Sequence, residues 1–75
     1  MTLTEDAARI RSRFDSADTA EFLEIISRIH DRLHTQQTRE YLGKKLEAAR
    51  LADPSERREM CRNLLPYLDW YLSGG

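Results

Sequence analysis

The sequence predicts an all-α protein: a compact bundle of about four helices that forms a single helical domain over residues 1–75. Apolar residues recur at intervals of three and four along most of the chain, as they do on one face of a helix. Residues that favour helix N-termini stand before each apolar stretch. Finally, a chain of 75 residues leaves room for one hydrophobic core only.

The first helix is predicted within residues 2–14. Thr2 and Glu5 have the spacing of a capping box, and Thr4 is an equally good first cap. The apolar seam of this segment is narrow and consists of Leu3, Ala7, Ile10 and Phe14. A short helix with so thin a seam needs tertiary contacts to be stable.

The second helix is predicted from about Thr19 to His34, after a polar break at residues 15–18 in which Asp18 can cap the helix. It has the strongest amphipathic pattern of the chain, formed by Phe22, Ile25, Ile26, Ile29 and Leu33. We therefore expect this helix to lie at the centre of the core.

The third helix is predicted from Gln36 or Arg39 to Leu51, with Thr35 or Thr38 as its cap. Its apolar seam is made by Leu42, Leu46 and Ala49. Gly43 is unfavourable in a helix interior, so it can indicate close packing of the backbone at that point.

The fourth helix has the clearest start signal of the sequence. Asp53 can cap it, Pro54 suits the first helical position, and Glu56 has the spacing of a capping box. Pro66 interrupts the helix, because an internal proline removes a backbone hydrogen bond and clashes with the preceding turn. We expect either a kink near Leu65 or two helices, the second covering about residues 67–72.

Composition and charge exclude several classes of function. The 12 basic and 13 acidic residues nearly balance, which argues against a protein whose main task is to neutralise phosphates. The single cysteine, Cys61, falls on an apolar stripe and is predicted to be a buried hydrophobic residue. A free thiol, the lack of a secretory signal pattern and the lack of a long apolar run predict a cytoplasmic protein that does not span a membrane.

The sequence contains no pattern typical of an enzyme, a cofactor site or a metal site. His30 and His34 are four residues apart on the predicted second helix, but a zinc site needs a third ligand and usually a fourth. The glycines do not form a phosphate-binding loop, and no nucleophilic triad can be assembled with any specificity. We therefore expect no catalytic activity, no cofactor and no bound metal.

Aromatic residues near the C-terminus suggest a protein-binding surface. They exceed what one buried stripe can hide, and Trp and Tyr are enriched at protein interfaces. Trp70 has two interpretations, since it can close one end of the bundle or contact a partner. The predicted partner-binding residues are aromatic anchors with a rim of arginines: Tyr67, Trp70, Tyr71, Tyr41, Arg57, Arg58 and Arg62.

The leading hypothesis is a small protein-interaction module that acts as a regulator, adaptor or inhibitor. Its partner would be a larger protein or a second copy of the chain, and a domain this small often gains stability from dimerisation. The alternative is a nucleic-acid-associated module with a helix-turn-helix arrangement. In that case Gln36, Gln37, Thr38 and Arg39 would reach base edges or phosphates.

Overall fold

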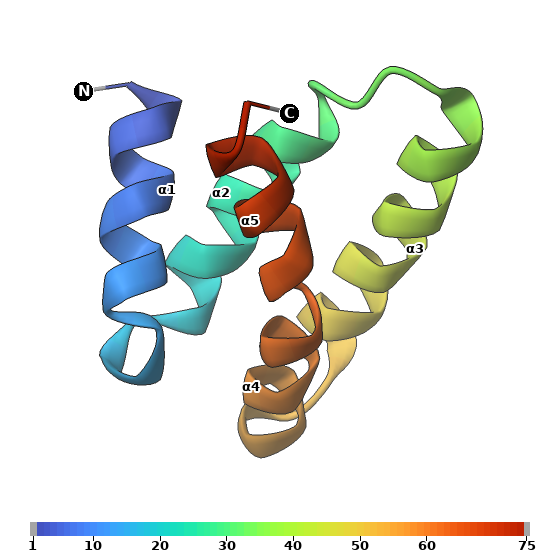
Figure 1. The fold of residues 1–75 in the computed structure, drawn as a ribbon. Coiled ribbons are helices and arrows are strands. Elements are labelled where there is room, and N and C mark those ends of the chain that lie inside the picture. Colours follow the sequence, from blue (N-terminus) through green and yellow to red (C-terminus); the bar gives the residue numbers. More distant parts are fainter. Residues whose placement is uncertain (1, 75) are drawn as a thin grey trace.

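The computed structural model describes residues 2–74 and confirms the all-α fold (Figure 1). The elements are α1 (Leu3–Ser12), a 3-10 turn η1 (Phe14–Ser16), α2 (Thr19–His30), α3 (Gln36–Leu51), α4 (Pro54–Asn63) and α5 (Leu65–Leu72). Two of these elements, α4 and α5, are the halves of a single helix that bends by 37° at Leu64, so residues 2–74 contain four helices.

The helix starts lie where the capping residues of the sequence predict them. Thr2 and Glu5 form a complete capping box at α1. The N-caps of the next three helices each accept a hydrogen bond from a backbone N–H of the first turn: Asp18 from Ala20, Thr35 from Thr38, and Asp53 from Glu56. These bonds satisfy backbone donors that have no partner within the helix.

The end of the second helix was predicted wrongly. The sequence favours a helix to His34, whereas α2 ends at His30 and the chain turns at Asp31. Leu33 is nevertheless buried, because this turn brings it back onto the core. The guanidinium of Arg39 donates to the carbonyl of Leu33 at 3.0 Å and holds the turn against α3.

The predicted bend before Pro66 is confirmed and begins at Leu64. The N–H of Leu64 donates to the backbone carbonyl of Cys61 at 2.9 Å, and the N–H of Tyr67 donates to the backbone carbonyl of Leu64 at 3.0 Å. Pro66 thus lies in the first turn of α5, where its missing N–H breaks no helical hydrogen bond. The bend allows α4 and α5 to pack against different neighbours.

Helix α2 lies at the centre of the core, as the sequence predicts, and packs against α1, α3 and both halves of the bent helix, α4 and α5. Phe22, Ile26 and Ile29 of α2 are almost completely buried. Cys61 is also buried, which confirms its prediction as a core residue. Burial raises the pKa of the Cys61 thiol, while the nearby guanidinium groups of Arg58 and Arg57 act in the opposite direction.

Helix α3 lies at one edge of the bundle, at the right in Figure 1, and packs against α2 and α4. Helix α5 packs against α2 and α1. One side of α3 therefore faces the core through Leu42, Leu46 and Ala49, as predicted, while its outer side carries exposed residues.

Gly43 does not mark a close backbone contact. A Cβ atom built at this position would meet Nε2 of His30 at 3.6 Å, which is an ordinary van der Waals distance. Gly43→Ala is therefore expected to stabilise the domain by about 0.5–1 kcal/mol, because alanine is the better residue in a helix interior. Urea denaturation of the two proteins measures this difference, and an unchanged or lower midpoint would show that the space beside His30 is needed.

Candidate functional site

Large hydrophobic side chains are exposed at two positions within residues 2–74, and both positions are on α3. Tyr41 is 58% exposed and Leu51 is 82% exposed. Ala48, between them in the sequence, is exposed as well. Positions 41, 44, 48 and 51 follow the three-four-three spacing that places residues on one face of a helix. We call Tyr41, Lys44, Ala48 and Leu51 the α3 strip, which is about 15 Å long at 1.5 Å per residue.

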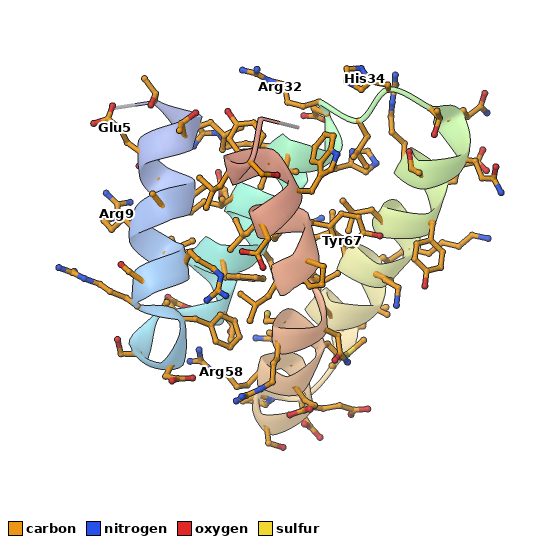
Figure 2. The ribbon with its side chains drawn as sticks, viewed as in Figure 1. Glu5, Arg9, Arg32, His34, Arg58 and Tyr67 are labelled. Carbon is orange, nitrogen blue, oxygen red and sulfur yellow. The ribbon has the colours of Figure 1, made fainter. Side chains whose placement is uncertain are left out.

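Tyr67 lies beside one end of the α3 strip. It is half-buried on α5, and Figure 2 shows it on the side of α5 that faces α3. Burial raises the pKa of the Tyr67 hydroxyl, the Tyr41 hydroxyl raises it further, and the ammonium of Lys45 lowers it. The same ammonium lies 4.9 Å from the centre of the Tyr41 ring, within the range of a cation–π interaction. Tyr41, Lys45 and Tyr67 therefore form one cluster.

Trp70 lies one helical turn beyond Tyr67 and is half-buried against the core. Its ring meets the ring of His34 edge-on, with 6.4 Å between the centroids. This contact closes the end of the bundle next to the loop between α2 and α3. The ring is still partly exposed, so Trp70 extends the aromatic surface that begins at Tyr41.

Tyr71 lies on a different side of α5. Its hydroxyl is 3.1 Å from the Oγ1 atom of Thr4, in the first turn of α1. A second contact between α1 and α5 is the ion pair of Arg11 and Asp69 at 3.0 Å. Tyr71 therefore joins α1 to α5, and the structure separates it from the cluster around Tyr41.

The predicted arginine rim also lies away from this cluster. Arg58 donates to the carbonyl groups of Phe14 and Ala17, both at 2.7 Å, and thereby holds the chain reversal between α1 and α2. Arg62 is exposed, and its guanidinium lies 5.8 Å from the centre of the Phe14 ring. The cations at the Tyr41 end of the α3 strip are instead Lys44, which belongs to the strip, and Lys45.

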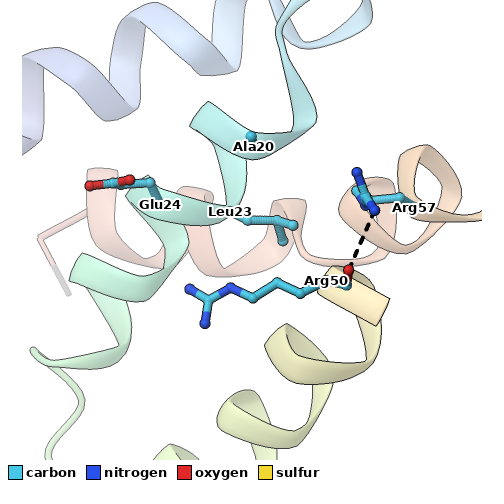
Figure 3. A pocket seen from close by; sticks show the side chains of 5 residues that line it. All are labelled: Ala20, Leu23, Glu24, Arg50 and Arg57. Carbon is cyan, nitrogen blue, oxygen red and sulfur yellow. Dashed lines mark hydrogen bonds between the residues drawn. The ribbon is translucent and has the colours of Figure 1, made fainter. Parts of the chain in front are cut away.

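Arg57 closes the connection between α3 and α4. It donates to the carbonyl groups of Ala49 and Ala52 at 3.1 and 2.8 Å, and Figure 3 shows its contact with the carbonyl of Arg50. The pocket in that view has a volume of about 220 Å³ and is lined by Ala20, Leu23, Glu24, Arg50 and Arg57. This is smaller than the ~300–1,000 Å³ of typical small-molecule sites. We therefore assign no ligand to this pocket.

The two histidines have different surroundings. His30 has its Nε2 atom 2.9 Å from the carbonyl of Arg39 and its Nδ1 atom 3.2 Å from the carboxylate of Asp31, whereas His34 contacts Trp70. Among the described residues, no group of three or more His, Cys, Asp or Glu side chains is placed to hold a metal ion. None of the helices within residues 2–74 has the length and apolar character needed to cross a bilayer.

The side chains of the predicted helix-turn-helix turn mostly make local contacts. The hydroxyl groups of Thr35 and Thr38 are 2.6 Å apart at the N-terminus of α3. The side-chain amide of Gln36 donates to the carboxylate of Glu40 at 3.1 Å, and the guanidinium of Arg39 donates to the carbonyl of Leu33. These side chains thus stabilise the start of α3 and the loop before it.

Comparison of the chain with protein-family models, with curated proteins and with solved structures gives no match.

Proposed function

We propose that the chain is a small cytoplasmic protein-interaction module, a regulator, adaptor or inhibitor, that binds a protein partner through the α3 strip and the neighbouring aromatic residues of α5. The observation that carries this proposal is the exposure of Tyr41 and Leu51 on the same helix. In a chain of 75 residues, whose core is necessarily small, leaving two large side chains in water forgoes stabilisation of about 25 cal/mol per Å² of apolar surface.

The chemistry around Tyr41 suits a binding anchor. Tyrosine joins a large apolar ring to a polar tip and loses little conformational entropy when it is immobilised. Tyr67 and Trp70 extend this surface, and Lys45 adds a cation at its edge. An aromatic centre with a charged border resembles the arrangement of binding hot spots. The proposal assigns no catalytic role to these residues.

The local contacts of the turn before α3 favour this function over nucleic-acid binding. Gln36, Thr38 and Arg39 would each have to leave an intramolecular partner to reach a base or a phosphate. A titration with duplex DNA at low and raised salt separates the two functions. Binding that weakens steeply with salt would support the nucleic-acid alternative.

Site-specific photo-crosslinking tests the proposal. Benzoylphenylalanine is placed at Tyr41 in one variant and at Asp15, an exposed residue of η1, in a matched control. The η1 turn follows α1, which lies on the other side of the molecule from α3 in Figure 1. We expect one discrete protein adduct from position 41 and none from position 15. Unlabelled wild-type chain should compete with this adduct, whereas the Tyr41→Ser/Leu51→Ser chain should not.

The double variant must remain folded for this comparison. Both positions are exposed, so its melting temperature should stay close to that of the wild type, because substitutions at such positions usually change stability by less than about 0.5 kcal/mol each. Equal adduct yields from positions 41 and 15 would overturn the proposal. Undiminished competition by the folded double variant would overturn it as well.

A further inference from the structure

We propose that the α3 strip pairs with the α3 strip of a second copy of this chain, with the two helices parallel. This inference rests on the proposed function and names the partner of the same surface. It is carried by the arrangement of charges on either side of the strip, together with the exposure of Tyr41 and Leu51.

The two borders of the α3 strip carry opposite charges. Glu40 immediately precedes Tyr41 of the strip, and Glu47 immediately precedes Ala48. Both glutamates are exposed. With 100° between successive residues, they fall on one border of the strip. Lys45 follows Lys44 and falls on the other border. In heptad terms the strip occupies positions a and d, the glutamates occupy position g, and Lys45 occupies position e.

Parallel pairing brings these opposite borders together. In a parallel pair, position g of one helix faces position e of the next heptad on the other helix. Glu40 therefore meets Lys45 of the second copy, and by symmetry the same pair forms a second time. In an antiparallel pair each border faces its own counterpart, so the two glutamates of one copy would face those of the other. Opposite charges favour the parallel arrangement, and like charges disfavour the antiparallel one.

The strip also limits how strong the pairing can be. Ala48 is small and permits close approach of the two helices, while Tyr41 and Leu51 each meet their own counterpart. Lys44 lies within the seam, and a lysine at such a position lowers the stability of a helix pair. A strip about 15 Å long also covers much less than the ~800 Å² per partner of a typical stable complex. The pairing is therefore weak and depends on concentration.

Charge exchange between the two borders tests this inference by sedimentation equilibrium. Glu40→Lys places like charges opposite each other twice, and Lys45→Glu does the same with the opposite sign. Each variant should raise the dissociation constant of the dimer about tenfold, the change expected when two exposed ion pairs become repulsive. An equimolar mixture of the two variants should restore the wild-type association, as should Glu40→Lys/Lys45→Glu in one chain.

Asp15→Lys is the matched control for Glu40→Lys, because it makes the same change of net charge at an exposed position on η1. It should leave the dissociation constant within about twofold of the wild-type value. Circular dichroism is to check that every variant keeps the helical content of the wild type. This step is needed because Glu40 accepts a hydrogen bond from Gln36.

The sign of the Glu40→Lys effect decides the orientation. In an antiparallel pair the new lysine would face Glu47 of the second copy, so tighter association of this variant would overturn the parallel arrangement. A wild-type chain that stays monomeric at millimolar concentration would overturn self-pairing altogether. If position 41 still forms its competed adduct with another protein in that case, the proposed function stands and only the identity of the partner is wrong.

Discussion

Phe22→Ala is expected to lower the free energy of unfolding by about 3–5 kcal/mol, a large part of the total stability of so small a domain. Phe22 is 1% exposed, and its ring meets that of Phe14 edge-on with 5.2 Å between centroids. Removing a buried phenylalanine costs about 3–5 kcal/mol. A chain of 75 residues has a total stability of only about 4–11 kcal/mol, at 0.05–0.15 kcal/mol per residue. Thermal unfolding followed by circular dichroism measures the loss.

Tyr41→Ala is the matched control for this variant, since it also truncates an aromatic residue on a helix. Tyr41 is 58% exposed and outside the core, so its loss should change the stability by less than about 0.5 kcal/mol. Similar losses from the two variants would mean that Tyr41 supports the fold of the single chain. It could then no longer be treated as a residue held ready for a partner.

Arg58→Ala is expected to destabilise the protein by about 2–3 kcal/mol. The guanidinium of Arg58 donates to two backbone carbonyl groups, Phe14 and Ala17, at 2.7 Å each. Hydrogen bonds that involve a charged group are stronger than neutral ones, so both lost bonds are costly. The carbonyl of Phe14 keeps one donor after the substitution, the N–H of Ala17 at 3.3 Å. Urea denaturation gives the difference in the free energy of unfolding.

Arg62→Ala is a close control for Arg58→Ala. Both guanidinium groups lie over the ring of Phe14, at 5.7 and 5.8 Å from its centroid, but only Arg58 donates to these carbonyls. Arg62→Ala should therefore change the stability by less than about 0.5 kcal/mol. Arg58→Lys should recover only part of the loss, because an ammonium lacks the planar fork of guanidinium donors. A loss from Arg62→Ala equal to that from Arg58→Ala would assign the effect to the ring contact instead.

Much of the fold was predictable because its signals are local in sequence. The N-caps Thr2, Asp18 and Asp53 specify where helices begin, and Pro66 specifies the bend, through interactions within a few residues. The end of α2 was not predictable in this way. Leu33 continues the apolar period of the helix, yet it reaches the core from a turn that is held by Arg39.

The candidate site was less predictable because it depends on which helices lie side by side. The sequence places Arg57 and Arg58 near the aromatic residues, but both donate to carbonyls of other segments, up to 44 residues away for Arg58. No local pattern signals such a contact. The sequence also shows Leu51 as one apolar position among several, and only the packing of α3 at the edge of the bundle leaves it 82% exposed.

We propose that this chain binds a protein through the outer side of α3, with a second copy as the inferred partner. Amide-resolved NMR spectra recorded during dilution from about 1 mM to about 20 μM test it most directly, since weak complexes dissociate in this range. We predict that the largest concentration-dependent shifts fall in Gln36–Leu51 and spread to Tyr67 and Trp70, while α1 is unaffected. Shifts centred on α1, or spectra that do not change with concentration, would contradict binding of a second copy through α3.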